Sequence, residues 1–311
     1  MVRPYKLILS IVLLLAGCEI NEVQILGNME GPSTVNFFDL NLYVQQVDRL
    51  NNGTIVFATN DGQLGIKPPV GDVKTVPYEG PWAVEALENR SFVVEQYTGG
   101  RPSYDVYDDQ LNLVSRVTSS ATGISFDQGL LVYIDDRGNV ISTFTTQRGN
   151  DSYTLPAGYY FKGSIAVTDD YIYVQVYTGG DHYLYQFDKS LQLVGQVPDD
   201  YRNTLMQGNG SKFFILNRVT SEYDVYNNVG NFVESIPKTN TSQYSYVLKD
   251  GNFLKQGDQL NNRVLVIASD INFDDVIWRQ EIDHLAGFNP LPNGQIIVST
   301  GYEVRFITPG Y

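Results

Sequence analysis

The stretch Leu50-Asn51-Asn52-Gly53-Thr54-Ile55-Val56-Phe57-Ala58-Thr59-Asn60-Asp61-Gly62 consists of two polar turns with an apolar run between them. The run, residues 55–58, is rich in β-branched and aromatic side chains, which favour strands. The Asn-Gly and Asp-Gly pairs that flank it suit the tight turns of β-hairpins, because these residue types accept positive φ angles. The stretch therefore predicts a buried strand between two tight turns.

The same pattern returns along the chain at intervals of 37 to 43 residues. A repeat of this length, built from short strands and turns, is typical of the blades of a β-propeller. Apolar runs follow the turns, for example residues 91–94, 130–134, 171–174, 212–216 and 295–298. The seven turn centres are Asn52, Asn89, Gln128, Asp170, Asn209, Asp250 and Asn293.

Within each repeat we expect four strands, A to D, with the repeated turn joining A to B. The C and D strands are clearest where apolar and polar residues alternate on both sides of an Asp or Asn turn, as in residues 104–114, 183–194 and 223–233. The B strands are more continuously apolar, as expected for strands between two neighbouring blades. We therefore predict an all-β fold, a seven-bladed β-propeller of four-stranded antiparallel blades.

The last repeat lacks a fourth strand, because the sequence ends at Tyr311 after two short strand-like runs. The stretch Thr34-Val35-Asn36-Phe37-Phe38-Asp39 has strand character and directly precedes the first A strand. An unpaired sheet edge invites aggregation, so a strand borrowed from the other end of the chain would protect the ring. We expect Thr34 to Asp39 to be the outer strand of the seventh blade, closing the ring. Residues 34–311 then form a single domain.

The chain resembles the β-propeller superfamily in general and no particular subfamily. It has no Trp-Asp dipeptide of the kind found in WD repeats, and its two tryptophans are too few for the quinone-type repeat. Tyr97-Thr98-Gly99-Gly100 and Tyr177-Thr178-Gly179-Gly180 resemble the double glycine of kelch blades. They occur in two copies only, so we interpret them as glycine-rich B–C loops.

The first residues have the pattern of a bacterial lipoprotein signal. Arg3 and Lys6 precede the apolar run of residues 7–14, which is too short for a membrane-spanning helix of roughly 20 residues. The run ends in Leu15-Ala16-Gly17-Cys18, which resembles the lipobox. This resemblance implies that residues 1–17 are removed and that Cys18 carries the lipid. An ordinary secretory signal with a chance cysteine is the alternative.

Residues 18–33 then read as the lipidated cysteine and a tether between the lipid and the domain. We expect a location in the cell envelope, at the outer membrane or the cell surface rather than the inner membrane. Cys18 is the only cysteine, so no internal disulfide can form. Without residues 1–17 the chain carries 19 Lys and Arg against 35 Asp and Glu, a net charge of −16. Such a surface repels phosphate backbones, so nucleic acid is not expected as a partner.

In the predicted ring, A–B and C–D turns lie on one face, and B–C and D–A loops lie on the other. The B–C and D–A loops vary between repeats, and variable loops on a rigid scaffold commonly bind partners. We expect a protein, peptide or glycan partner, and the alternative is that the aromatic residues pack between blades. The candidate binding residues of this face are Tyr78, Trp82, Arg101, Tyr159, Tyr160, His182, Tyr201, Arg202 and His284.

Catalytic patterns are scarce. His182 and His284 are the only histidines, with no metal-ligand spacing and no Gly-x-Ser-x-Gly motif, so we predict neither a metal nor a cofactor. Asp48 and Glu85 lie on adjacent predicted A strands and could form a carboxylate pair in the central channel. The sequence therefore favours a non-enzymatic, membrane-anchored binding scaffold. A glycosidase- or lyase-like envelope enzyme is the main alternative, and a purely structural envelope part is a third.

Overall fold

The structure is a computed structural model that describes residues 34–36, 41–87, 90–98, 101–118, 123–125, 129–135, 137–145, 149–200, 204–209, 211–238, 246–248, 250–259 and 262–311. Its contacts divide the chain into Met1–Ser33 and Thr34–Tyr311, and all of the described residues belong to the second unit. The predicted signal segment, the tether and Cys18 lie outside the described residues. No helix in the described ranges is long and apolar enough to cross a membrane.

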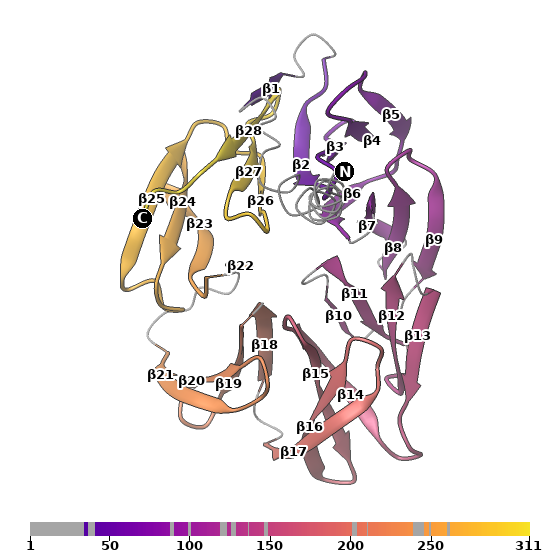
Figure 1. The fold of residues 1–311 in the computed structure, drawn as a ribbon, viewed down its shortest axis with the longest axis vertical. Coiled ribbons are helices and arrows are strands. Elements are labelled where there is room, and N and C mark those ends of the chain that lie inside the picture. Colours follow the sequence, from indigo (N-terminus) through magenta and orange to yellow (C-terminus); the bar gives the residue numbers. More distant parts are fainter. Residues whose placement is uncertain are drawn as a thin grey trace, which may run out of the picture. The chain divides into compact units, whose positions relative to one another are not determined.

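The described strands form seven four-stranded antiparallel sheets, numbered here in chain order (Figure 1). Sheet 1 consists of β2 (Val44–Arg49), β3 (Ile55–Thr59), β4 (Gln63–Lys67) and β5 (Lys74–Pro77). Sheet 2 consists of β6 (Pro81–Ala86), β7 (Ser91–Thr98), β8 (Arg101–Asp108) and β9 (Leu113–Thr118). Sheet 3 consists of β10 (Gly123–Ser125), β11 (Leu131–Ile134), β12 (Val140–Thr145) and β13 (Gly149–Thr154).

Sheets 4 to 6 repeat this arrangement, and sheet 7 differs in the origin of one strand. Sheet 4 consists of β14 (Tyr160–Val167), β15 (Tyr171–Thr178), β16 (Asp181–Asp188) and β17 (Leu193–Asp199). Sheet 5 consists of β18 (Thr204–Asn209), β19 (Lys212–Asn217), β20 (Glu222–Asn227) and β21 (Phe232–Pro237). Sheet 6 consists of β22 (Tyr246–Val247), β23 (Phe253–Gln259), β24 (Asn262–Ala268) and β25 (Val276–Ile282). Sheet 7 consists of β26 (Gly287–Pro290), β27 (Ile296–Ser299), β28 (Glu303–Ile307) and β1 (Thr34–Asn36).

Sheet 7 takes its outer strand from the beginning of the described chain. Thr34 pairs with Arg305 and Val35 with Val304, and Figure 1 shows indigo β1 beside yellow β28. Of the predicted strand Thr34 to Asp39, the structure describes residues 34–36. The all-β prediction is confirmed, and the borrowed strand lies where the sequence pattern placed it.

Local turn chemistry explains why the repeated polar sequences end strands. The side-chain oxygens of Asn52, Asp250 and Asn293 each accept a hydrogen bond from the backbone N–H two residues later, at 3.0 to 3.1 Å. Such a hydrogen bond satisfies a backbone N–H group within the turn. The chain can therefore reverse direction there instead of continuing to pair with the neighbouring strand. In the C–D hairpins of sheets 2, 4 and 5, one side-chain oxygen accepts two backbone N–H groups, and the residues that supply it are Asp108, Asp188 and Asn227.

Burial follows the position of a strand in its sheet. Every residue of β3, the second strand of sheet 1, is buried, whereas most residues of the outer strands β5, β17 and β21 are exposed. Three outer strands contain a proline near their end, Pro77, Pro198 and Pro237, which offers no N–H to an incoming strand. These edges are therefore poor templates for pairing with another chain.

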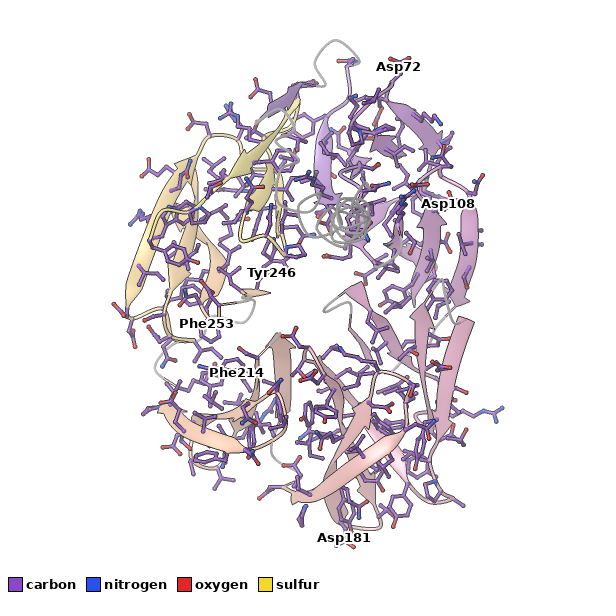
Figure 2. The ribbon with its side chains drawn as sticks, viewed as in Figure 1. Asp72, Asp108, Asp181, Phe214, Tyr246 and Phe253 are labelled. Carbon is purple, nitrogen blue, oxygen red and sulfur yellow. The ribbon has the colours of Figure 1, made fainter. Side chains whose placement is uncertain are left out.

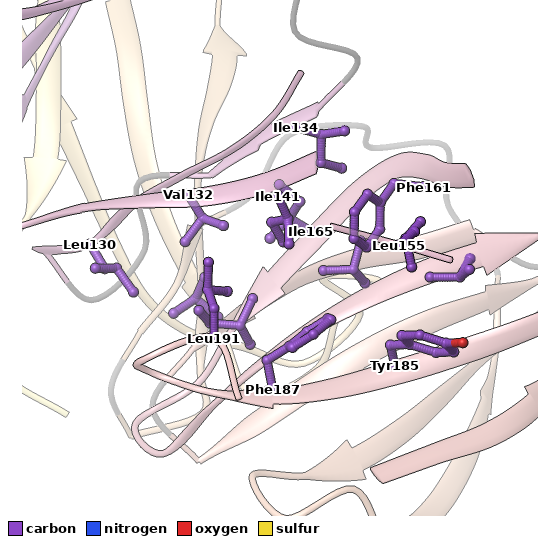
Figure 3. Close-up of a cluster of buried hydrophobic side chains, with 14 residues drawn as sticks. Leu130, Val132, Ile134, Ile141, Leu155, Phe161, Ile165, Tyr185, Phe187 and Leu191 are labelled. Carbon is purple, nitrogen blue, oxygen red and sulfur yellow. The ribbon is translucent and has the colours of Figure 1, made fainter. Parts of the chain in front are cut away.

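Apolar clusters join each sheet to the next among the described residues. Figure 3 shows the cluster between sheets 3 and 4, which includes Val132, Ile165 and Phe187. Phe214 of sheet 5 meets Phe253 of sheet 6 edge-on, with ring centroids 5.2 Å apart (Figure 2). Similar clusters join the remaining consecutive pairs, and one joins sheet 7 to sheet 1. The succession of packed sheets thus returns to its start.

Sheets 7 and 1 also meet through their backbones. Val44 N–H donates to the carbonyl of Gly301 at 2.8 Å, and the Ser299 hydroxyl donates to the carbonyl of Val44 at 2.6 Å. β2 has a register shift between Val44 and Gln46. At this shift the Gln45 carbonyl lies very close to Gly287. A Cβ atom added to Gly287 would lie 2.1 Å from the Gln45 carbonyl oxygen. We call these contacts the 7–1 seam.

Candidate functional site

Three aromatic rings form a row across sheet 4 at the end that carries its B–C turn. Tyr160 of β14 pairs with Tyr177 of β15, Tyr177 pairs with His182 of β16, and His182 pairs with Asp199 of β17. Directly paired residues of antiparallel strands point to the same face of a sheet. The three rings therefore occupy the first three strands, and the carboxylate of Asp199 follows them on the fourth.

The rings of this row are stacked and reach the surface. The Tyr160 and Tyr177 centroids are 5.5 Å apart with planes at 29°, and those of Tyr177 and His182 are 6.1 Å apart at 23°. Tyr160 and Tyr177 are 42% and 40% exposed. Large aromatic side chains left this exposed are suited to binding, because burying them removes much apolar area from water. We call Tyr160, Tyr177 and His182 the aromatic row.

A cleft of about 620 Å³ adjoins the aromatic row and shares His182 with it. Sheet 4 contributes the B–C turn at Gly180, the first residues of β16 and the end of β17, and sheet 5 contributes Tyr226. Asp181, where β16 begins, is labelled in Figure 2. The cleft is lined by Gly180, Asp181, His182, Tyr183, Pro198, Asp199, Asp200 and Tyr226.

Charges of both signs surround the cleft. The buried amide of Gln175 donates to Asp199 Oδ2 at 2.5 Å, and the Asp200 N–H donates to Asp199 Oδ1 at 2.8 Å. Burial lowers the pKa of Lys162, while Asp199 and Asp200 oppose this shift and Arg218 reinforces it. Lys162 therefore lies within electrostatic reach of Asp199 and Asp200, and Arg218 lies within reach of Lys162, so the surroundings of the cleft are not purely acidic.

The structure brings together two of the candidate binding residues, Tyr160 and His182. Tyr159, next to the row, is partly buried against the cluster between sheets 3 and 4. His284 is exposed in the connection between β25 and β26, with a φ of 58°. Trp82 lies in β6 and Arg101 in β8, but their side chains are outside the described set, as are Tyr201 and Arg202 entirely.

Tyr78 packs in the interior and does not lie on a binding surface. This agrees with the alternative that aromatic residues of these connections pack between the sheets. It is 9% exposed, and its hydroxyl donates to Asp105 Oδ2 at 3.2 Å. Asp105 is fully buried and forms a two-bond ion pair with Arg116, at 2.6 and 2.7 Å. Burial, followed by the charge of Asp105, raises the pKa of Tyr78. Its ring packs edge-on against Tyr107, which places Tyr78 between sheets 1 and 2.

Sequence reasoning did not include Tyr177 or Asp199 among the candidate residues. A signal for Tyr177 was present, because Gly179-Gly180 forms a two-residue turn with positive φ at both glycines. Such a turn fixes the hairpin register and sets Tyr177 opposite His182. No comparable local signal places Asp199, which joins the row through the following hairpin.

The two carboxylates of the enzyme alternative lie on the first strands of sheets 1 and 2. Asp48 is 7% exposed, and its two oxygens accept the backbone N–H groups of Ala86 at 2.6 Å and Arg49 at 2.7 Å. Burial raises the pKa of Asp48 to about 7, although these two hydrogen bonds lower it. Glu85 Oε2 accepts the amide of Asn289 in β26 at 2.9 Å, so these polar contacts connect sheets 1, 2 and 7. In the described residues, no group of three or more His, Cys, Asp or Glu side chains is arranged to hold a metal ion.

Neither a protein-family model nor a curated protein matches this sequence. Among solved structures, a catalytically inactive virginiamycin B lyase from Staphylococcus aureus with quinupristin has a TM-score of 0.51 and 10% identity, over 88% of this chain and 98% of that one. Hsv2 from Kluyveromyces lactis has a TM-score of 0.48 and 11% identity, over 83% and 89%. BamB from Moraxella catarrhalis has a TM-score of 0.45 and 13% identity, over 85% and 84%. These are β-propeller proteins, and at such identity the likeness to the lyase shows the fold alone: this chain has a β-propeller fold.

Proposed function

We propose that this chain is a lipid-anchored β-propeller of a bacterial cell envelope that binds a partner through the B–C and D–A side of its sheets and catalyses no reaction. The observation that carries the proposal is the aromatic row of sheet 4. Tyr160 is stacked on Tyr177 and Tyr177 on His182, both tyrosines are about 40% exposed, and the row adjoins a cleft of about 620 Å³. Clefts of this volume are within the range of ligand sites.

We further infer that the seven sheets are the blades of a closed ring. This is supported by the apolar clusters that join each sheet to the next and by the cluster between sheets 7 and 1. The pairing of β1 with β28 removes an open edge from the last sheet. A ring without a hinge is a rigid scaffold, which lowers the entropy lost on binding a partner.

The anchor is inferred from the resemblance of Leu15-Ala16-Gly17-Cys18 to the lipobox. Each acyl methylene buried in a bilayer contributes about 0.8 kcal/mol, and stable attachment needs two or more chains. We expect the wild-type chain, expressed in a bacterium, to incorporate labelled palmitate and to fractionate with membranes. The Cys18→Ser variant is expected to lose the label entirely. A variant that is still labelled and processed like the wild type would falsify the anchor.

Partner binding is tested by capture from detergent-solubilised envelopes. Tyr177→Ala removes the central ring of the aromatic row and is expected to reduce the captured partner about tenfold, because an aromatic anchor typically contributes more than 1 kcal/mol. Tyr311→Ala is the matched control, since Tyr311 is 56% exposed and its hydroxyl donates to Asp250 in the A–B turn of sheet 6, on the other side of the sheets. Equal capture by the wild type and both variants would remove sheet 4 from the proposal.

An envelope enzyme acting on carbohydrate is the second candidate, because one observation favours it. A carboxyl with a pKa of about 7, such as Asp48, keeps its proton near neutral pH and can act as a general acid. Glu85, adjacent to the Ala86 N–H that binds Asp48, would be the second carboxylate. Polysaccharide turnover by the purified protein that disappears in Glu85→Gln, with the fold intact, would favour the enzyme over the scaffold.

A further inference from the structure

The cleft beside His182 is bordered on the sheet 4 side by the outer strand β17. Val197 of β17 pairs with Leu184, which belongs to the apolar cluster that joins sheets 4 and 5. Directly paired residues of antiparallel strands point to the same face, so Val197 lies on the face of sheet 4 that meets sheet 5. It is 52% exposed and directly precedes Pro198 of the cleft lining. One border of the cleft is therefore apolar and open to solvent.

Sheet 5 supplies aromatic side chains to the other border. Tyr226, which lines the cleft, is stacked on buried Phe213 with ring centroids 5.0 Å apart. Phe232 of β21 meets the Tyr226 ring edge-on at 5.9 Å and is 57% exposed. We call Val197, Tyr226 and Phe232 the apolar margin of the cleft. Covering such exposed apolar side chains with a partner removes their surface from water, which favours binding.

Carboxylates from both sheets surround the cleft. Sheet 4 contributes Asp181, Asp199 and Asp200 to the lining. Sheet 5 adds Asp224: burial raises the pKa of Tyr226, and the charges of Asp224 and Asp199 raise it further. Both carboxylates therefore lie within electrostatic reach of the aromatic wall.

The cations near these carboxylates are fewer among the described residues. Lys162 lies within reach of Asp199 and Asp200, and Arg218 lies within reach of Lys162. An excess of negative charge therefore remains around the cleft, and the whole chain has a net charge of −14. A cationic group is attracted to such a surface and an anionic group is repelled.

We infer that the cleft and its apolar margin bind a segment of a partner protein in which a lysine or arginine stands beside large apolar residues. The cationic side chain enters the cleft towards the carboxylates, and its apolar neighbours cover Val197 and Phe232. This inference rests on the proposed function, because it names the chemistry of the partner at the same site. The charges select a basic segment, and the apolar margin selects among basic segments those that also carry apolar side chains.

The test is direct binding of short synthetic peptides to the full-length chain, purified in a nonionic detergent. The probes are a lysine–leucine peptide, a lysine–serine peptide and a glutamate–leucine peptide of equal length. The lysine–leucine peptide is expected to bind about tenfold more tightly than each of the others, because it alone offers both a cation and an apolar surface. Added salt is expected to weaken its binding, because salt screens the attraction between exposed charges.

Two substitutions test the two halves of the site. Phe232→Ala is expected to weaken binding of the lysine–leucine peptide about tenfold, because it removes an exposed aromatic ring of the margin. Asp181→Lys reverses an exposed charge of the lining and is expected to weaken the lysine–leucine peptide and to strengthen the glutamate–leucine peptide. Leu113→Ala is the matched control. Leu113 takes the corresponding place in sheet 2, paired with Tyr107 on the outer strand, and is 49% exposed.

No binding of the lysine–leucine peptide, equal affinity for the lysine–leucine and glutamate–leucine peptides, or binding that is unchanged in Phe232→Ala overturns the inference. These results are distinguishable from failure of the proposed function. An envelope partner whose capture depends on Tyr177 but not on Phe232 or Asp181 leaves the scaffold standing and removes the basic segment. Peptide binding that depends on Phe232, by a chain that never acquires lipid on Cys18, supports the inference and removes the anchor.

Discussion

Between about pH 4 and pH 7 the free energy of unfolding is expected to fall by about 4 kcal/mol through Asp48, and Asp48→Asn is expected to remove this fall. Burial raises the pKa of Asp48 from 3.8 to about 7 in the folded protein. Each unit of pKa difference corresponds to about 1.4 kcal/mol of stability. The folded state binds this proton more tightly than the unfolded state, so the contribution is fully present below pH 3.8 and is lost as the pH rises through about 7.

The measurement is urea unfolding of the wild type and of Asp48→Asn across this pH window. The quantity compared at each pH is the difference between their free energies of unfolding. The substitution removes the titrating group but also weakens one of the two backbone contacts, to Ala86 or Arg49, so a pH-independent loss is expected as well. Asp61→Asn is the control, because the Thr59 hydroxyl holds the pKa of Asp61 below its usual value, so Asp61 titrates below this window and its difference from the wild type is expected to stay constant across it. A constant difference between wild type and Asp48→Asn over the window would contradict the prediction.

Gly287→Ala is expected to lower the free energy of unfolding by about 3 kcal/mol. The added Cβ would lie 2.1 Å from the carbonyl oxygen and 3.1 Å from the carbonyl carbon of Gln45. Both are backbone atoms in the register shift of β2, so no side chain can rotate away to make room. The substitution must therefore displace β26 from β2 and disturb the 7–1 seam.

Gly257→Ala is the matched control for this substitution. Gly257 also lies within a strand, β23, and a Cβ there would meet its nearest neighbours at an ordinary 3.8 Å. Its effect on the unfolding free energy is expected to stay within about 0.5 kcal/mol. Equal urea midpoints for the two variants would show that the seam tolerates an extra methyl group and that the close approach of Gly287 to Gln45 is unimportant for stability.

The turns of the fold were readable because their chemistry is local. Asn52, Asp250 and Asn293 each bind a backbone group two residues away, so the sequence around them specifies the turn without help from the rest of the chain. The repeat spacing then predicted antiparallel four-stranded sheets, which the structure contains. By contrast, the close approach of Gly287 to Gln45 depends on a register shift that no residue pattern announces.

The candidate site was only partly predictable, for a related reason. Tyr78 and Tyr160 both lie in or beside connections between sheets, yet Tyr78 is buried on Asp105 and Tyr160 is exposed on Tyr177. The position of a residue in the repeat predicts the end of the sheet at which it lies. Which side chains then meet depends on strand register and on the neighbouring sheet. These contacts therefore cannot be predicted from the sequence pattern alone.

The pairing of β1 with β28 has a consequence for the order of folding. Thr34 and Arg305 are partners, so one strand of sheet 7 precedes the other six sheets in the sequence and the rest follow them. Sheets 1 to 6 are each contiguous in the chain and can form from contacts between neighbouring segments, whereas sheet 7 needs strands from both sides of them. Until β28 is in place β1 has no partner strand, so sheet 7 is expected to be the last of the seven to form.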